Sequence, residues 1–323
     1  MIPVVTGVGA ALPERVVPNT AFAAIGITDE WISARTGIRE RRRLEPGQPL
    51  GELALRASEG ALADAGRKPS QVDQVVVATV TADLLSPGLA PELAFRLGVP
   101  QPAAMDLSAA CTGFLYALDH ACAMIESGRR RCVLVTAAEA ASRIADPADR
   151  FTAPLFGDAA GAVVVEAAGS RCCAACAPAV VLGTDGARQG ILYVDREHQR
   201  VRMRGAEVYE QAVITMADSA RRVCAARGVG LHEIDLFVPH QANARIIRAV
   251  LRELAFPAER TVVHVGDTGN TSAASIPVAL ERAQREGLLT AGARVGMAAF
   301  GAGLTWGAAL LDWKGCRHLL ATA

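Results

Sequence analysis

Short apolar runs alternate with longer helical stretches along the chain. The runs are apolar on both faces, as VDQVVVATV at 72–80 illustrates, which is typical of strands in a covered, largely parallel sheet. The helical stretches end at glycines such as Gly98 and Gly128. In the first half, strands are expected at the N-terminus and at 72–80, 103–108, 131–140 and 160–168, and helices at 91–98 and 111–127.

The second half follows the same plan. Strands are expected at 234–239 and 261–265, helices at 241–254 and 272–286, and a glycine-broken strand pair at 293–313. No linker, low-complexity segment or clear sequence repeat separates the halves, so the duplication is one of architecture. We therefore expect an α/β protein whose halves, 1–168 and 169–323, pack as one unit.

Composition narrows the class of protein. The 323 residues include 33 Lys and Arg and 33 Asp and Glu, and a net charge of zero argues against bulk nucleic-acid binding. The mean hydropathy of +0.25 is high, but no apolar run reaches the roughly 18 residues of a membrane span, so we attribute it to an interface between subunits. The N-terminus lacks the pattern of a signal peptide, which predicts a cytoplasmic protein with no membrane association.

Eight cysteines raise the questions of disulfides and metals. The chain is large and rich in core residues, so we expect most of the thiols to be reduced and buried. The cluster CCAAC at 172–176 is similar to a set of metal ligands, but no second Cys or His pair stands at zinc-site spacing, so no metal is predicted.

Cys111 follows a strand and opens a helix in DLSAACTGFLYAL. Unpaired amides and the helix dipole favour a thiolate there, which predicts a lowered thiol pKa and a nucleophile. Ser108, Ala109 and Ala110 leave room for a substrate to approach. The alternative is one more buried cysteine.

Two polar residues of the second half stand where strands give way to helices. His240 follows an apolar strand in LFVPHQAN, the usual place for ligands in α/β sheets, and Asn270 stands in the glycine-flanked turn of DTGNTSAAS. The alternatives are a core or capping histidine and a turn or capping asparagine. The segment FGAGLTWG at 300–307 lacks the ending of a P-loop, and its glycines let a backbone amide approach an oxyanion. Cys, His and Asn in this order also describe papain-like proteases, but SAACTG differs from the context expected there.

Eight ordered blocks together resemble the β-ketoacyl-ACP synthase III family of the thiolase superfamily. They are GVGAALPERVVPN, DEWISARTGIRERR, DLSAACTGFLYAL, DPADR, LFGDAAGAVVV, VPHQANARII, GNTSAAS and FGAGLTWGAAL. The resemblance implies a thiolase-like five-layer αβαβα fold from two duplicated halves, and a homodimer. It implies a decarboxylating condensation of an acyl-CoA starter with malonyl-ACP to give 3-oxoacyl-ACP, as in fatty-acid initiation, without a cofactor.

The resemblance also implies roles for the candidate residues. Cys111 carries the acyl group as a thioester, and His240 and Asn270 donate hydrogen bonds that stabilise the enolate formed when malonyl-ACP loses CO₂. The amides of Cys111 and Ala302 hold the tetrahedral oxyanion, and Phe300 lines the malonyl pocket. A covalent intermediate and fixed donors are physically suited to this chemistry.

Contacts with CoA and the carrier protein are predicted at the entrance. Trp31 and Arg35 are spaced i, i+4, so a helix puts them on one face, and the resemblance assigns them, with Arg150, to the adenine and phosphate end of CoA. It implies a pantetheine tunnel lined by Gly205, Tyr209, Ala242, Asn243 and Arg245. A second set shares one helical face beside the tunnel mouth and predicts a dock for the acidic ACP, the alternative being a solvated basic face: Arg245, Arg248 and Arg252.

Departures from the family pattern concern the lid and the acyl pocket. The segment 192–203 is shorter than usual, and Ser86 in LLSPGL stands where many members place an aromatic ring. This predicts a starter larger or more polar than acetyl, and Arg143 would pair a distal carboxylate. Alternatives are therefore glutaryl-CoA in biotin-precursor synthesis, polyketide priming, or acyl transfer without condensation.

Overall fold

The computed structural model describes residues 1–168 and 177–315, and the cysteine cluster at 172–176 lies outside them. Two sheets form the frame. The first has the strand order β1-β7-β6-β4-β5. Its strands are β1 (Pro3–Ala11), β4 (Gln74–Ala78), β5 (Ala103–Leu107), β6 (Cys132–Ala140) and β7 (Asp158–Ala167).

The second sheet has the order β11-β12-β13-β8. Its strands are β8 (Ala179–Thr184), β11 (Leu236–Pro239), β12 (Arg294–Gly301) and β13 (Thr305–Asp312). Read from β8, it repeats the pairing of the first sheet from β1: two antiparallel pairs and then a parallel pair. The sheets draw on separate parts of the chain, and the boundary expected near residue 168 stays a prediction.

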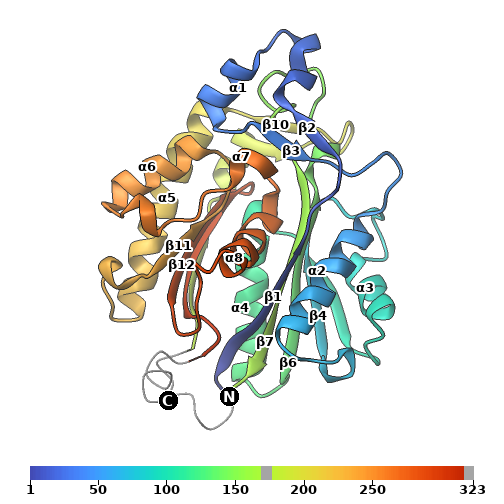
Figure 1. Ribbon diagram of the computed structural model, residues 1–323, viewed down its shortest axis with the longest axis vertical. Helices are drawn as coiled ribbons and strands as arrows, with labels where there is room; N and C mark the ends of the chain where they lie inside the picture. The colour runs from blue at the N-terminus through green and yellow to red at the C-terminus, as the bar shows by residue number, and fades with distance from the viewer. Residues whose placement is uncertain (169–176, 316–323) are drawn as a thin grey trace.

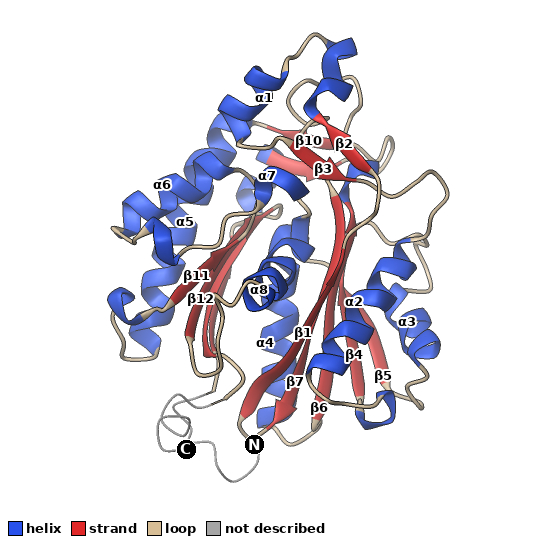
Figure 2. Ribbon diagram, viewed as in Figure 1, coloured by secondary structure: helices blue, strands red, loops and turns tan. Residues whose placement is uncertain are grey.

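Helices fill three layers around the sheets (Figures 1 and 2). The helices α2 (Leu50–Asp64) and α3 (Leu89–Leu97) cover the outer face of the first sheet, and α4 (Gly113–Glu126) and α8 (Ser275–Arg285) lie between the sheets. The second sheet is covered by α5 (Gly205–Ala226), against which α6 (Ala244–Leu254) packs. This is the five-layer αβαβα arrangement that the sequence predicts.

Smaller elements cap the ends of the strands. They are β2 (Val16–Pro18), η1 (Asn19–Ile25), α1 (Asp29–Thr36), β3 (Glu40–Arg42), η3 (Ala110–Thr112), β9 (Leu192–Val194), β10 (Val201–Met203), α7 (Val265–Thr268) and η9 (Ser272–Ala274).

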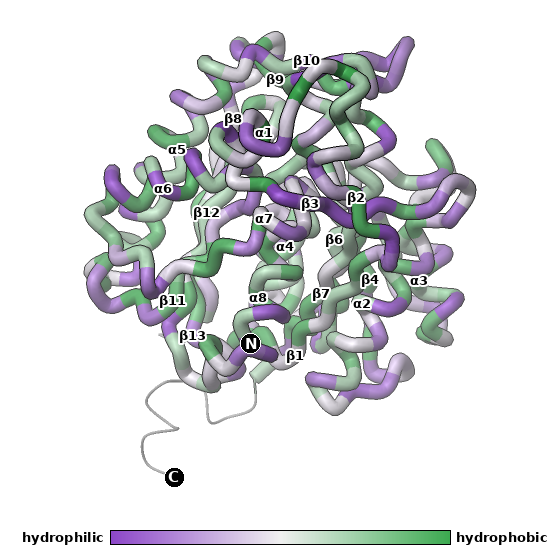
Figure 3. The backbone as a smooth tube through the Cα atoms, turned by 45° about the horizontal axis from the view of Figure 1, so that its top comes forward, coloured by the Kyte–Doolittle hydropathy of each residue, from purple (hydrophilic) through white to green (hydrophobic). Residues whose placement is uncertain are grey.

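Figure 3 shows hydrophobic colour along the interior strands, and hydrophilic colour on β3 and peripheral loops. Within the described residues, no helix is both long and apolar enough to cross a membrane.

Glycines set the distance between β1 and α2. A Cβ built on Gly9 would lie 2.3 Å from the Ala57 carbonyl oxygen, and one on Gly7 would lie 2.3 Å from that of Ala61. Such contacts are sterically forbidden, so only glycine lets this helix lie so close to the strand. The first sheet is thereby packed closely against its outer helical layer.

Two expectations about strands are wrong. The sheets are mixed rather than largely parallel, since β7 returns beside β6 without a crossover helix and pairs with it antiparallel. The run TVVHV at 261–265 forms only one bridge, between Thr261 and Phe237. The Gln241 side chain instead bonds the Val262 carbonyl (3.0 Å) and the His264 amide (2.9 Å), taking the place of a partner strand.

Candidate active site

A cavity of about 720 Å³ opens between the ends of the two sheets. It brings together the three residues that the sequence singles out, Cys111, His240 and Asn270, with Phe300 and Ala302 also in its wall. The first half supplies only the cysteine of this set, and the other four come from strands and turns of the second half. The site therefore exists only when the halves are packed together.

Cys111 sits in the short helix η3, immediately before α4. The preceding Ala110 has φ +47°, a left-handed conformation that is uncommon for a residue with a side chain, and this sharp turn presents the cysteine to the cavity. At the end of β12, a Cβ on Gly301 would lie 2.8 Å from the Cys111 amide nitrogen. The glycine-rich loop therefore lies against the backbone of Cys111.

The pKa of the Cys111 thiol differs from the sequence prediction. Burial, and to a smaller extent the nearby Glu139 carboxylate, raise it to about 11, although hydrogen bonds from Ser272 and the local backbone oppose the rise. The expected lowering by the start of a helix is therefore corrected, since loss of water outweighs it in the unliganded site. The thiol needs another group to accept its proton.

His240 is held as a hydrogen-bond donor toward the cavity. Its Nδ1 lies 2.6 Å from the Ser275 hydroxyl oxygen, which already accepts from the Gln241 amide at 3.3 Å. With the Ser275 hydroxyl donating to Nδ1, the neutral imidazole carries its proton on Nε2. Burial lowers the pKa of His240 to about 4, so the ring is neutral near pH 7.

Asn270 is also oriented so that its side chain donates hydrogen bonds toward the cavity. Its Oδ1 accepts a hydrogen bond from the Ser272 amide at 2.9 Å, which leaves the side-chain NH₂ to donate into the cavity. Its backbone is fixed on both sides, by Leu155 (2.8 Å) and by Gly157 (3.0 Å). His240 and Asn270 thus both present donors and not acceptors to a bound group.

The mouth of the cavity carries an aromatic and cationic cluster. The guanidinium carbon of Arg35 lies 4.3 Å from the centre of the Trp31 ring, and that of Arg150 lies 4.7 Å from it. Phe151, which the sequence analysis missed, packs on Trp31 with ring centres 5.9 Å apart and is 60% exposed. A flat aromatic ring flanked by two cations suits a nucleotide with phosphates.

The remaining predicted tunnel residues also line the cavity, namely Gly205, Tyr209, Ala242, Asn243 and Arg245. The Oδ1 of Asn243 caps α6 by accepting from the Arg245 amide, and its Nδ2 donates to the Arg35 carbonyl, which ties α6 to α1. A second hollow of about 280 Å³ lies beside the mouth. Its wall contains Arg245, Arg248 and Arg252, so these three share one face as predicted.

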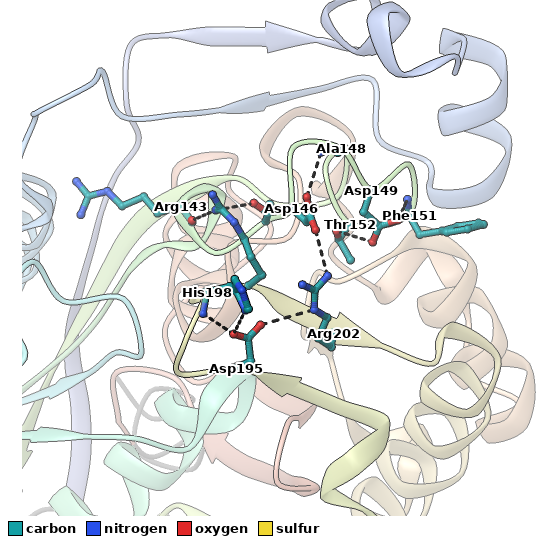
Figure 4. A network of polar contacts seen from close by, with 11 residues as sticks. Arg143, Asp146, Ala148, Asp149, Phe151, Thr152, Asp195, His198 and Arg202 are labelled. Atoms are coloured by element: carbon teal, nitrogen blue, oxygen red, sulfur yellow. Dashed lines mark hydrogen bonds and ion pairs between the residues drawn. The ribbon is translucent and has the colours of Figure 1, made fainter.

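The hairpin of β9 and β10 covers one side of the cavity, and Figure 4 shows how polar contacts hold it. Arg202 on β10 pairs with Asp146 at 3.1 Å and with Asp195 at 3.6 Å. The Val201 amide donates to the Ile144 carbonyl at 2.8 Å. The hairpin is thereby fixed to the loop that carries Arg150 to the mouth.

Arg143, expected in the acyl pocket, lies outside the wall of this chain's cavity, whereas the place of Ser86 at the acyl pocket of a partner subunit stays a prediction. Arg143 is exposed, pairs with Asp83 at 2.5 Å and donates to the Gln48 carbonyl at 2.7 Å, and it is not in the cavity wall. Ser86 is exposed in the loop before α3. The inner wall is instead apolar, formed by residues such as Val80, Ile144, Phe156, Met203 and Met216.

Three polar residues behind the site were not predicted from the sequence, namely Ser272, Ser275 and Glu139. The two serines belong to the same GNTSAAS block as Asn270, and small polar residues at a strand-to-helix turn are the signal that marks them. Glu139 ends an apolar strand, and nothing local marks it. Within 1–168 and 177–315, no group of three or more potential metal ligands occurs.

Comparison with known proteins agrees with this geometry. The family profile of 3-oxoacyl-[acyl-carrier-protein] synthase III matches residues 105–186, and its C-terminal profile matches 224–313. A β-ketoacyl-[acyl-carrier-protein] synthase III 2 of Streptomyces coelicolor is 46% identical over 97% of this chain and 94% of its own. One from Ruegeria pomeroyi is 44% identical over 96% of this chain and 98% of its own.

Solved structures give the same result. The 3-oxoacyl-(acyl carrier protein) synthase III of Pseudomonas aeruginosa superposes with a TM-score of 0.92 at 43% identity, covering 98% of this chain and 99% of that one. The priming β-ketosynthase of the R1128 polyketide pathway superposes with a TM-score of 0.91 at 37% identity and 97% coverage of both chains. The fold and site are those of a thiolase-type acyltransferase. The chain belongs to the β-ketoacyl-ACP synthase III family.

Burial of His240 makes a prediction about its charge. Because the pKa is lowered to about 4, the ring is expected to stay neutral, with its proton on Nε2, from pH 5 to 8. Histidine ¹⁵N and ¹³C chemical shifts followed by NMR measure this directly, with His240→Gln to assign the signal. A midpoint near the ordinary histidine value of about 6.5 would contradict the buried, neutral ring.

Proposed function

We propose that this chain condenses an acyl group from acyl-CoA with malonyl-ACP, with loss of CO₂, to give 3-oxoacyl-ACP. The observation that carries the proposal is the cavity in which the Cys111 thiol faces two neutral donors, His240 and Asn270. Membership of the family supports the same reaction. The two thioesters supply their own leaving groups, so the proposed reaction uses no cofactor.

In the first half-reaction the Cys111 sulfur attacks the acyl-CoA carbonyl. The new C–S bond forms as the bond to CoA breaks, CoA leaves as its thiol, and the acyl group stays on Cys111. The Trp31 cluster would hold the adenine and phosphate end of CoA, and the wall from Gly205 to Asn243 would guide pantetheine inward. Cys111 and Ala302 amides would donate to the oxyanion of the tetrahedral intermediate.

In the second half-reaction malonyl-ACP loses its carboxylate as CO₂. The electron pair of the broken C–C bond becomes an enolate, and the thioester oxygen gains the negative charge. His240 Nε2–H and the Asn270 amide would donate to that oxygen, and both are already oriented before substrate arrives. The enolate carbon then attacks the acyl group and releases the Cys111 thiolate. Simple acyl transfer without condensation does not need these two donors, so we do not favour it.

We further propose an uncharged hydrocarbon starter. The only charged side chains in the described cavity wall are Arg35 and Arg245, and both belong to the mouth. A glutaryl carboxylate would reach the apolar wall without a cation, since Arg143 pairs with Asp83. Fatty-acid initiation is our main proposal, and the likeness to a polyketide priming enzyme favours that pathway as the second candidate.

A panel of acyl-CoAs tests the starter and the nucleophile together. Acetyl-, butyryl-, octanoyl- and glutaryl-CoA are incubated with the protein, and peptide mass mapping follows the label. The apolar acyl groups are expected on Cys111, with broad length selectivity because each methylene contributes only about 1–3 kcal/mol. Glutaryl-CoA is expected to react at least about tenfold more slowly. Acylation of another cysteine, or a preference for glutaryl-CoA that Arg143→Ala abolishes, would contradict these assignments.

His240→Ala and Asn270→Ala are expected to separate the half-reactions. Each loses a fixed donor to the enolate, so decarboxylation and condensation should fall by about 10²–10³. Acylation of Cys111 should stay within a few-fold of the wild-type rate. The two rates are measured by release of labelled CO₂ and by intact mass. Condensation at the wild-type rate in either variant would remove that residue from the mechanism.

We also propose that the basic face of α6 docks the carrier protein. Arg248 and Arg252 line the hollow beside the mouth, and a group delivered there enters the cavity past Arg245. An acidic carrier would be steered to such a face, and its binding would weaken with salt.

Charge reversal at Arg248→Glu with Arg252→Glu tests the dock. The KM for malonyl-ACP is expected to rise about tenfold or more, while acylation by acyl-CoA changes little. The control is Arg222→Glu with Arg285→Glu, which makes the same charge change on exposed side chains of other faces. Equal effects of the two double variants, or equal losses in both half-reactions, would refute docking on α6.

We also propose that the protein forms a homodimer. The edge strand β5 has one unpaired side, and the loop and helix beside it expose Leu84 (57%), Leu85 (90%) and Phe95 (85%). Exposed apolar side chains of this size next to a free strand edge are typical of a subunit interface. Sedimentation equilibrium is expected to give twice the chain mass.

A further inference from the structure

Glu139, at the end of β6, is a fully buried carboxylate that the mechanism above does not use. Its Oε2 accepts hydrogen bonds from the Thr81 hydroxyl at 2.5 Å and the Val80 amide at 3.2 Å. Its Oε1 accepts from the Ser272 hydroxyl at 3.1 Å. No ion pair to Glu139 occurs among the residues that the structure describes. A buried carboxylate without a cation is costly and calls for a specific reason.

Ser272 connects this carboxylate to the nucleophile. Its hydroxyl is hydrogen-bonded to the Cys111 thiol as well as to Glu139. In the resting state the one proton of the hydroxyl goes to the carboxylate, so the thiol S–H donates to the serine oxygen, whereas a hydroxyl that donates to the sulfur favours the thiolate. Ser272 has φ +51°, a left-handed conformation that is held by the hydrogen bond from its backbone amide to Asn270 Oδ1. The backbone is thus strained at the residue that links the two groups.

We propose that Cys111 and Glu139 share one proton through Ser272, so that Glu139 accepts the proton of the thiol when the sulfur becomes a nucleophile. The S–H bond breaks and its proton passes to the Ser272 oxygen, while the serine's own proton passes to Glu139 Oε1. The site holds one negative charge before and after the step. When CoA leaves as a thiolate beside the same hydroxyl, the proton returns by the reverse path and protonates it.

The two pKa values place the proton mainly on the sulfur at rest, so its transfer to Glu139 accompanies attack on the acyl group. Burial raises the pKa of Glu139 to about 7 and that of Cys111 to about 11. Two neighbouring anions in a buried site repel each other, so the pair loses its first proton near neutral pH and its second only at much higher pH.

The other groups that face Glu139 do not titrate in this range. Three of these groups come from the segment after β4, namely the hydroxyls of Thr79 and Thr81 and the amide of Val80. Two come from η9, namely the Ser272 hydroxyl and the Ala273 amide. The Cys111 thiol is the one titratable neighbour recorded within the described residues.

The pH dependence of Cys111 alkylation tests the proposal. The full-length protein is treated with iodoacetamide from about pH 5 to 10, and the rate at Cys111 is followed by peptide mass mapping. In the wild type the rate should rise to a midpoint near 7 and then level off, because the single-anion state has a fixed share of thiolate. In Glu139→Gln that inflection should vanish, and the rate should rise about tenfold per pH unit toward the thiol's own pKa. At pH 9 the variant should therefore react about tenfold or more faster than the wild type.

A second variant keeps the test decisive if Glu139→Gln does not fold. Thr81→Val removes a donor to the carboxylate from a residue outside the cavity wall, so the inflection should move to higher pH. A structural role alone would lower the rate at every pH without moving the inflection. An unchanged inflection in both variants, or none in the wild type, overturns the proposal. The inference rests on the proposed acylation of Cys111, but alkylation does not use acyl-CoA, so the two can fail separately.

Discussion

The close contact between Gly301 and Cys111 is the constraint on which the site depends. A side chain at 301 would lie 2.8 Å from the Cys111 amide nitrogen, so only glycine lets the end of β12 reach the turn before α4. This contact joins the sheet that carries the nucleophile to the sheet that carries His240. Gly113, at the start of α4, makes a similar approach to Ala78 and Ala273. Small residues at this seam place chemistry from both halves within one cavity.

Each donor in the cavity has its direction set by a neighbour behind it. The Ser275 hydroxyl fixes the proton of His240, and the Ser272 amide turns the Asn270 side chain so that its NH₂ faces the cavity. Such prior orientation means that the site needs little rearrangement as charge develops on a substrate. The same turn that holds Asn270 also contacts Cys111 and Glu139 through Ser272, so one short segment supports all three residues.

The cavity separates recognition from chemistry. Its mouth holds an aromatic ring between cations, which suits the charged end of CoA, and its interior is apolar around the thiol. An apolar interior raises the free energy of any unpaired charge, which explains the neutral His240 and the high thiol pKa. The buried Glu139 carboxyl lies behind this wall and is hydrogen-bonded to Ser272.

The sequence alone determined the order of most strands and helices and marked Cys111, His240 and Asn270 as candidates, and the family that its ordered blocks resemble assigned the residues at the mouth. Local periodicity, turn residues and ordered motifs can be recognised directly in a linear sequence. Tertiary structure decided the rest. The run at 261–265 does not form the expected strand, because the Gln241 side chain bonds its backbone. Arg143 pairs with Asp83. The raised pKa of Cys111 and the link from Ser272 to Glu139 depend on burial and on contacts between residues 133 positions apart, and no local pattern carries that information.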